Sequence, residues 1–395
     1  MKIALVLSYL MSSGNSFVLS FFAYKKVFLF IILISIIVIS AFALKREIGA
    51  LSTSEDTKKY ESKEYLGIKY CYNGVFHNIF NPITDFKLAS DKEDNSKEFN
   101  FFKMLLKRYK KPENGAIKVK NLKKEDFEEK PTNDAVYWLG HSSLILELNG
   151  KRVIVDPIFA NASSLPIMFS RWHRSPIKRK DLPKIDYVLI THNHYDHLER
   201  KTAQFLKKSH FIVPLGVKKT LISWGVKEEN ITELGWGENF VDEKIVFNAE
   251  PAMHFTQRFL TDANKTLWNS YVVQSKNSNK IKAFDKQIFI AGDGGFGEHS
   301  RIIADKYKKN GKFDLIAVEI DAWNVRWPFV HMFPRENVEM IKIFEPKRFL
   351  PVHYGVFPLG MHEYDLSIKF LLELAEKFGV KDKILMLPIG GKALI

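Results

Sequence analysis

Cysteine is almost absent from this sequence. Cys71 is the single cysteine among 395 residues, which excludes an intramolecular disulfide framework and any zinc cluster built from cysteines. A metal site in this chain would therefore have to use histidine and carboxylate ligands. No internal repeat is found between Asp134 and Ile395.

Acidic residues are scarce relative to basic ones. The chain carries 45 Asp and Glu against 59 Lys and Arg, which gives a formal net charge of +14 and an isoelectric point near 9.4. Such a surplus attracts anions, namely nucleic acid, anionic lipid head groups or a phosphorylated substrate. The lysines are evenly scattered, so a generally lysine-rich composition explains the surplus equally well.

One long apolar run stands near the N-terminus. Val27–Leu44 contains no charged residue and has about the minimum length of a membrane-spanning helix. Ala41–Ala43 also resembles a signal-peptidase site. We therefore expect residues 1–46 to be a membrane anchor or signal segment, with the catalytic domain on the extracytoplasmic, periplasmic side. Basic residues flank both ends of the run, so a cytoplasmic-facing orientation stays open.

The remaining chain divides by texture into a charged N-terminal extension, residues 47–133, and one domain, residues 134–395. In the second part, strand-like runs alternate with helical patterns at residues 199–207, 300–308, 334–344 and 364–378. The runs are "AVYWL", "SLILEL", "RVIVD", "DYVLI", "FIVP", "KIVF", "QIFIAGD" and "LIAVEI". This alternation predicts an α/β arrangement.

The stretch "ITHNHYDHLER" concentrates metal-binding side chains directly after a predicted strand. His192 and His194 are two residues apart, so they project to the same side of an extended segment. The chain must then turn for Asp196 and His197 to face a neighbouring position. One short loop thus offers ligands to two metal ions. Catalytic sites of this kind use His nitrogens and carboxylate oxygens and leave a coordination position open for water.

Further ligands follow later strand-like runs. His254 lies in "EPAMHF", Asp293 in "IFIAGDGG" and His353 in "RFLPVHYG". A carboxylate such as Asp293 can bridge two metals, and each of the two histidines can complete one coordination sphere. Two neighbouring cations lower the pKa of a shared water and stabilise the attacking and leaving oxygens.

Together these motifs resemble the metallo-β-lactamase superfamily. The match is closer to its N-acylphosphatidylethanolamine-hydrolysing phospholipase D family and bacterial relatives of that family. It runs from about Asp134 to about Pro388 and includes "YWLGHSSLILELNGKRVIVDPIF", "RWHRSPIKRKDLPKIDYVLITHNHYDHLE", "HFTQRFLTDANKTLWNSY", "FIAGDGGFG" and "PVHYGVF". The resemblance implies an αββα sandwich, two packed mixed β-sheets flanked by helices, with a metal site at one edge.

The resemblance also implies a set of ligands. One zinc would be held by His192, His194 and His254, and a second by Asp196, His197 and His353, with Asp293 bridging the two. Zinc follows from the family alone, since this ligand set accepts other divalent metals.

Other residues receive roles by the same resemblance. Asp156 would lie beneath the metals and fix a ligand imidazole, and His141 would lie beside the site. His331 would bind phosphate oxygens or move a proton, so that Asp196, Asp293 and His331 are the expected catalytic groups. Tyr195, Trp268 and Trp327 are further candidates for supporting the site or contacting substrate. Gly294 departs from the family, where a hydroxyl-bearing residue is expected.

The implied activity is hydrolysis of N-acylphosphatidylethanolamine-like lipids to N-acylethanolamine and phosphatidic acid through a metal-bridging hydroxide. We expect apolar side chains to face the lipid, drawn from Phe255, Phe259, Leu260, Trp268, Trp323, Trp327, Phe329, Phe333 and Phe357. A basic patch at residues 170–180 would attract anionic head groups. The expected partners are a phospholipid or another anionic substrate and a bilayer, and no nucleic acid.

Alternatives stay open at this stage. A lactone or another phosphodiester would use the same hydroxide. A non-catalytic, membrane-anchored binding protein is disfavoured because all seven expected ligand positions are filled. The oligomeric state is left open.

Overall fold

The computed structural model describes residues 32–35, 38–82, 112–163, 169–276, 284–360 and 362–395. The chain divides into two compact units, Met1–Ile48 and Gly49–Ile395. The second unit contains every residue that the sequence proposes for the site.

The predicted membrane-associated, extracytoplasmic placement is contradicted by the described residues. Within the described residues, no helix combines the length and the apolar character that crossing a bilayer requires. The described helical residues here are 32–35 and 38–48, and the second stretch includes Lys45, Arg46 and Glu47. A spanning helix needs about 20 predominantly apolar residues. The rest of Val27–Leu44 lies outside the described residues.

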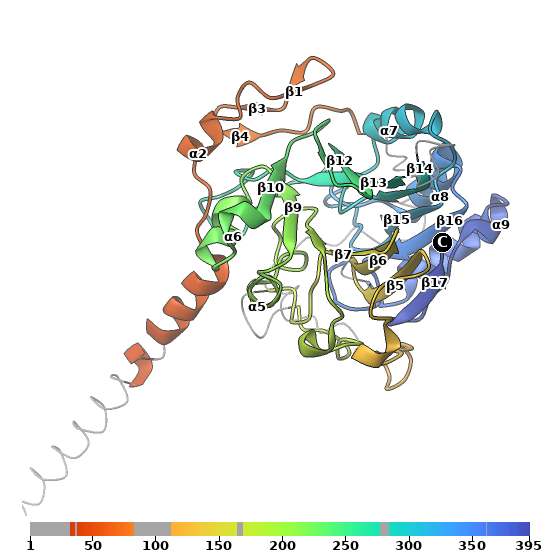
Figure 1. Cartoon of the computed structure of the whole chain (residues 1–395), viewed down its shortest axis with the longest axis horizontal. Coiled ribbons are helices and arrows are strands. Elements are labelled where there is room, and N and C mark those ends of the chain that lie inside the picture. Colours follow the sequence, from red (N-terminus) through yellow and green to blue (C-terminus); the bar gives the residue numbers. More distant parts are fainter. Residues whose placement is uncertain (1–31, 36–37, 83–111, 164–168, 277–283, 361) are drawn as a thin grey trace, which may run out of the picture. The chain divides into compact units, whose positions relative to one another are not determined.

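The second unit is built around two mixed sheets (Figure 1). The first sheet has seven strands, in the order β10 (Ile231–Leu234), β9 (His210–Pro214), β8 (Tyr187–Leu189), β7 (Lys151–Val155), β6 (Ser143–Leu148), β5 (Ala135–Gly140) and β17 (Gly391–Leu394). β7 to β10 pair in parallel, whereas β17, β5, β6 and β7 pair antiparallel.

The second sheet has six strands, in the order β11 (Asn239–Val241), β12 (Ile245–Pro251), β13 (Asn269–Lys276), β14 (Phe284–Ile290), β15 (Leu315–Glu319) and β16 (Arg348–Val352). β11 to β14 pair antiparallel, and β14 to β16 pair in parallel. Parallel neighbours end at the same edge of a sheet, so the loops that follow β14, β15 and β16 meet there.

Three layers of apolar side chains hold the sheets and helices together. One buried cluster joins the inner faces of both sheets, with Leu146 and Val153 on one side and Phe247 and Leu315 on the other. A second cluster covers the outer face of the first sheet, against α5 (Arg200–Phe205) and α6 (Lys218–Ser223). A third covers the outer face of the second sheet, against α7 (Glu298–Lys308), α8 (Pro334–Phe344) and α9 (Leu366–Lys377). The architecture is an αββα sandwich.

The four predicted helical patterns are confirmed. Residues 199–207 contain α5, and residues 300–308 fall within α7. Residues 334–344 coincide with α8, and residues 364–378 contain α9. α8 begins with Pro334 at its first turn, where the missing N–H of proline costs no helix hydrogen bond.

The described part of the charged extension packs on the sandwich. It contains α2 (Ser54–Lys58) and two hairpins, β1 (Glu64–Tyr65) with β2 (Ile68–Lys69) and β3 (Cys71–Tyr72) with β4 (Val75–Phe76). Tyr70 and Phe76 are buried in one cluster with Trp236 and Trp268. This segment therefore contributes apolar side chains to the domain rather than only charge.

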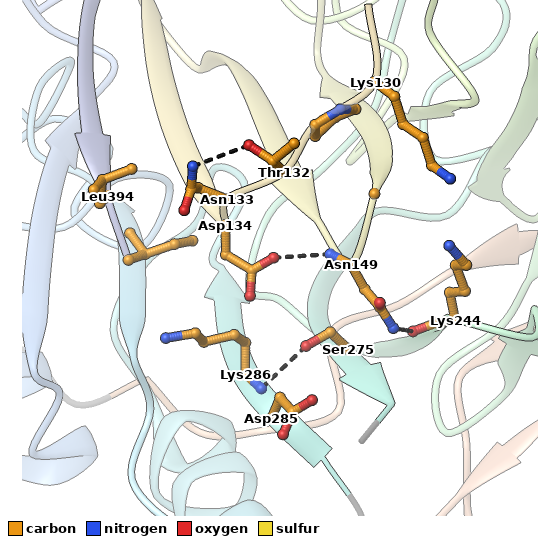
Figure 2. A pocket seen from close by; sticks show the side chains of 13 residues that line it. Lys130, Thr132, Asn133, Asp134, Asn149, Lys244, Ser275, Asp285, Lys286 and Leu394 are labelled. Atoms are coloured by element: carbon orange, nitrogen blue, oxygen red, sulfur yellow. Dashed lines mark hydrogen bonds between the residues drawn. The ribbon is translucent and has the colours of Figure 1, made fainter. Parts of the chain in front are cut away.

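A pocket of about 550 Å³ lies where β5 and β14 begin and β13 and β17 end (Figure 2). Asn149 ties this end together, because its backbone N–H donates to Asp134 at 2.8 Å and its amide donates to the carbonyl of Lys276 at 3.1 Å. Of the predicted site residues, His141 follows the opposite end of β5 and Asp293 follows the opposite end of β14. This pocket therefore lies away from the candidate site.

Candidate metal centre

The seven predicted ligands come together in the folded chain. They come from loops beside the edge where the parallel strands end, which is where α/β sheets commonly place their sites. His192 to His197 follow β8, Asp293 follows β14 and His353 follows β16, while His254 follows β12. These residues form overlapping groups whose potential ligand atoms lie within 4.8 Å of one another.

The first histidine group consists of His192, His194 and His254. Nε2 of His192 lies 2.9 Å from Nδ1 of His194, and Nε2 of His254 lies 3.3 Å from the same atom. Burial lowers the pKa of His194 and His254 to about 3 and that of His192 well below its ordinary value. These imidazoles are therefore neutral, which is the state that binds a metal.

The second group consists of Asp196, His197 and His353. Nε2 of His197 lies 3.4 Å and Nε2 of His353 lies 3.6 Å from Oδ2 of Asp196. Oδ2 of Asp293 lies 3.0 Å from both of these nitrogens and 3.9 Å from Nε2 of His192. Asp293 thus stands between the two groups.

Electrostatics differ between the two groups. Burial alone would lower the pKa of His197 and His353, but the facing carboxylates, Asp293 foremost, outweigh it. The pKa of His197 lies well above its ordinary value and that of His353 is raised to about 10. Burial likewise favours protonation of Asp196 and Asp293, yet neighbouring imidazoles hold both carboxyl pKa values well below the usual range. Without a metal, the protonated imidazoles of His197 and His353 balance the two carboxylates, and a cation that displaced these protons would take their place.

The donor set fits divalent metal ions. Nε2 of His197, Nε2 of His353 and Oδ1 of Asp293 are buried, and among the described residues none of these atoms has a hydrogen-bond partner with acceptable geometry. Three imidazole nitrogens of the first group also face one another. Buried polar atoms are normally paired, and cations in the two groups would satisfy all of them. The same nitrogen and oxygen ligands accept zinc, iron or manganese.

Asp156 lies against His197, with its Oδ2 2.8 Å from Nδ1 of the ring. Thr191 holds the carboxylate in place, since its backbone N–H donates to Oδ1 at 2.8 Å and its hydroxyl donates to Oδ2 at 2.6 Å. This arrangement leaves Nε2 of His197 turned toward Asp293. Carboxylates that bind the outer nitrogen of a ligand imidazole commonly tune metal sites.

His141 belongs to the cluster more closely than the sequence implied. Its Nε2 lies 2.9 Å from Oδ2 of Asp196, and its carbonyl accepts the backbone N–H of His353 at 3.0 Å. Burial lowers the His141 pKa to about 3. His141, Asp156 and His353 have φ angles of 52°, 39° and 70°, a region that non-glycine residues seldom adopt. Such backbone strain concentrates at functional sites.

His331 lies at the border of both groups. Its ring centroid is 5.3 Å from that of His353 and 5.4 Å from that of His254. Burial lowers the His331 pKa to about 4, yet 12% of its side chain remains exposed. A neutral imidazole that still reaches solvent can contact a bound substrate.

The aromatic candidates separate into two kinds. Tyr195 is half-buried and donates to the carbonyl of Arg258 at 3.1 Å, and Trp327 donates to the carbonyl of Ala322 at 2.7 Å. Trp268 does not contact substrate in this fold, because it is 1% exposed beneath the N-terminal segment and donates to Ala252. Of the other apolar candidates, the exposed ones are Phe255, Phe259, Leu260 and Phe329, and the buried ones are Trp323, Phe333 and Phe357.

Close packing of the backbone explains why residue 294 is a glycine. A Cβ at this position would lie 3.0 Å from the carbonyl oxygen of Met253, and one at Gly295 would lie 2.4 Å from the carbonyl oxygen of Phe329. The two glycines let the loop after β14 pass between the chains that lead to His254 and His331. A hydroxyl-bearing residue at 294 would push the backbone beside His254 away.

Two residues near the site escaped the sequence analysis. Asn78 holds the backbone of His254, with Nδ2 donating to its carbonyl at 2.9 Å and Oδ1 accepting its N–H at 3.2 Å. Glu319 lies 3.4 Å from His331. Glu319 could have been noticed because it is the only charged residue in the apolar run "LIAVEI", whereas no pattern in the sequence singles out Asn78.

Comparisons with known proteins agree with this geometry. The protein-family model of the β-lactamase superfamily domain matches the sequence over residues 151–354. An uncharacterised protein of Mycobacterium tuberculosis is 36% identical over 251 residues, which cover 61% of this chain and 64% of the mycobacterial protein. The chain thus spans less than two thirds of that relative.

N-acyl-phosphatidylethanolamine-hydrolyzing phospholipase D 1 of Caenorhabditis elegans is 31% identical over 292 residues, which cover 68% of this chain and 79% of the worm protein. Among solved structures, isothiocyanate hydrolase from Delia radicum gut bacteria matches with a TM-score of 0.52 and 19% identity, over 66% of this chain and 99% of that one. At this identity the likeness shows the fold alone, and it confirms the predicted αββα sandwich.

Proposed function

Because this chain belongs to the metallo-β-lactamase superfamily and, within it, to the N-acylphosphatidylethanolamine-hydrolysing phospholipase D family, we propose that it is a metal-dependent hydrolase of phospholipase D type. The substrate is an N-acylphosphatidylethanolamine-like lipid, and the products are an N-acylethanolamine and phosphatidic acid. The proposed cofactors are two zinc ions.

The single observation that carries the proposal is the pair of ligand groups that share Asp293. One oxygen of Asp293 lies 3.0 Å from His197 and His353 and 3.9 Å from His192. Cations bound in both groups would supply Lewis acidity and lower the pKa of a water molecule. Asp196 and Asp293 provide the negative charge that holds them, and Asp156 keeps His197 in its orientation.

His331 serves the phosphoryl group. Its ring is neutral because burial lowers its pKa to about 4. A neutral imidazole has one N–H, which can donate a hydrogen bond to a phosphoryl oxygen whose charge grows in the transition state. Attack of water on phosphorus breaks the bond to the ethanolamine oxygen, and that oxygen leaves with a proton as the N-acylethanolamine.

Exposed aromatic side chains beside the ligands support a lipid substrate. Phe255 follows His254, and its ring centroid lies 4.8 Å from that of His194. Phe255 and Phe329 are each 40% exposed, and Leu260 is 84% exposed. Large apolar side chains that stay exposed next to a polar centre offer a surface for acyl chains.

A basic pocket supports an anionic head group. It has a volume of about 1020 Å³, and Arg171, Arg174 and Lys178 are among its lining residues. The guanidinium of Arg171 lies 5.2 Å from the ring centroid of Phe357, and that ring lies 4.9 Å from the ring of His141. The pocket is therefore linked to the second group through two packed side chains.

Product analysis by mass spectrometry tests the proposal. The zinc-loaded protein is incubated with N-acylphosphatidylethanolamine, with a lactone and with a simple phosphodiester. We expect N-acylethanolamine and phosphatidic acid from wild type and from Asp285→Asn, an exposed carboxylate on β14, but not from Asp293→Asn. Hydrolysis of the lactone alone, or release of free fatty acid from the lipid, would contradict the assignment.

A further inference from the structure

Glu319 is an isolated carboxyl group in an apolar strand. It is the last residue of β15, it is 0% exposed, and its neighbours Val318 and Ile320 belong to the buried cluster under α7, α8 and α9. A buried carboxyl group is unfavourable unless its oxygens are paired. Its position at the end of β15 places it beside the ligand loops, so its partners decide what it does.

The first oxygen of Glu319 is fixed to the chain next to His331. Its Oε1 accepts the backbone N–H of Met332 at 2.8 Å. The residue on the other side, Val330, has its carbonyl 3.1 Å from Nδ1 of His254, so that carbonyl accepts the ring N–H. His331 therefore lies between two anchored neighbours, and one of these anchors is Glu319.

The second oxygen faces the ring itself. Oε2 of Glu319 lies 3.4 Å from Nδ1 of His331, and within the described part of the chain both atoms are buried without another hydrogen-bond partner. This distance is long for a hydrogen bond, as catalytic pairs often are before substrate binds. Because Nδ1 faces Glu319, the ring presents Nε2 on its other edge.

We propose that Glu319 is a positioning residue for His331. Glu319 donates a hydrogen bond to Nδ1 of the His331 ring, and the ring hydrogen therefore stays on Nε2, which faces the substrate. This inference rests on the proposed function. In the proposed arrangement, Oε1 of Glu319 accepts the hydrogen bond from the backbone N–H of Met332, and the hydrogen on Oε2 is donated to Nδ1 of His331. Nε2–H is then the donor that meets the phosphoryl oxygen.

The protonation of Glu319 agrees with this geometry. Burial foremost, together with the nearby Asp293 carboxylate, raises the pKa of Glu319 well above its ordinary value, which favours the form of the carboxyl group that keeps its hydrogen. A neutral carboxylic acid can donate a hydrogen bond as well as accept one. It therefore suits both partners at once, the Met332 N–H and the bare Nδ1 of His331.

The proposal predicts that glutamine at position 319 preserves the function of Glu319 and that leucine does not. In Glu319→Gln, the amide oxygen accepts from Met332 and the amide NH₂ donates to Nδ1, so both contacts persist. In Glu319→Leu both are lost, and the ring hydrogen is free to move between Nδ1 and Nε2. The matched control is Glu147→Gln, at a buried glutamate that pairs with Arg152 instead.

Nitrogen NMR of the zinc-loaded, histidine-labelled full chain reads the ring directly, with the His331 signals identified by their absence in His331→Gln. We expect a hydrogen-bearing Nε2 and a bare Nδ1 in wild type, in Glu319→Gln and in Glu147→Gln, and a mixture of tautomers in Glu319→Leu. With the lipid substrate, Glu319→Leu should lower kcat about 10- to 100-fold at unchanged metal content and nearly unchanged KM. The two glutamine variants should keep kcat within about twofold of wild type.

A hydrogen on Nδ1 in wild type would overturn the inference, and so would a loss of kcat in Glu319→Gln as large as in Glu319→Leu. The wild-type spectrum alone tests the proposed position of the ring hydrogen, even if Glu319→Leu does not fold. The two proposals fail separately, because the ring measurement needs no turnover. A bare Nδ1 without lipid hydrolysis would remove the proposed substrate and keep the role of Glu319.

Discussion

At the scale of single residues, histidines a few ångströms apart differ in charge because their neighbours differ. His194 and His254 are surrounded by other imidazoles and buried, and the pKa of each falls to about 3. His353 is equally buried but faces Asp293 and Asp196, and its pKa rises to about 10. Neutral imidazoles are ready to bind a metal, whereas a protonated one must first lose its proton.

This difference predicts that the two metal ions bind with different pH dependence. Above about pH 5 the first histidine group is already neutral, so affinity there should hardly change. In the second group, His197 and His353 keep their protons up to their raised pKa values. Affinity should therefore increase with pH from 6 to 9, by about tenfold per pH unit for each proton released.

Chelator competition at several pH values, combined with calorimetry in two buffers of different ionisation enthalpy, measures both effects. The first group is the internal control, since it shares the protein and the metal. Equal pH dependence of the two sites, or binding to the second group without proton release, would show that the carboxylates do not set the charge of His197 and His353.

At the scale of elements, the segment before the sandwich supports the metal site. Asn78 lies beyond β4 and bonds both the N–H and the carbonyl of His254, while it also accepts the indole N–H of Trp268 at 3.2 Å. Two elements far apart in sequence are thus joined at a ligand. The backbone of His254 is held from outside its own sheet.

Asn78→Ala should therefore loosen the first histidine group. The lost hydrogen bonds leave buried backbone groups unpaired, so the free energy of unfolding should fall by about 1–3 kcal/mol. Metal affinity of this group should fall about tenfold. Denaturant unfolding and chelator competition measure the two changes. Asn81→Ala, three residues on, is the control and should change neither quantity; an unaltered affinity in Asn78→Ala would contradict the supporting role.

Local patterns predicted most elements but not the contacts between distant ones. The four helices and the apolar strand runs were readable because periodicity and β-branched runs act locally. The clustering of the candidate ligands could be predicted because their residue types are restricted and follow strands. Asn78 was not, because its role depends on a contact across 176 positions of the sequence. The sequence left open whether Trp268 supports the site or contacts substrate, because an aromatic residue near a ligand can pack inward as well as toward substrate.

The predicted placement at a membrane rested on hydropathy alone. Val27–Leu44 has the apolar character of a spanning segment, but a span also requires one long helix of that character, and the described residues contain none. The described helical residues 38–48 carry charged side chains at their C-terminal end. The mean hydropathy of a window does not reveal where a helix begins or ends.

At the scale of the whole molecule, the apolar residues that stabilise the sandwich and the polar residues of the candidate site lie in different parts of the fold. Its apolar layers lie between and outside the sheets, and the polar ligands gather in loops beside the ends of β8, β12, β14 and β16. The loops can therefore hold strained backbones and buried charges, because the packed strands below them fix their ends. This division explains how one chain carries a dense cluster of histidines and two aspartates, namely His141, His192, His194, His197, His254, His331 and His353 with Asp196 and Asp293.

The most direct test of the account is the fate of the oxygen that comes from water. The zinc-loaded protein hydrolyses N-acylphosphatidylethanolamine in water enriched in a heavy oxygen isotope, and mass spectrometry locates the label. Attack on phosphorus predicts one heavy oxygen in phosphatidic acid and none in N-acylethanolamine. Label in the N-acylethanolamine or in a released fatty acid would contradict the account, because water would then have attacked carbon instead of phosphorus.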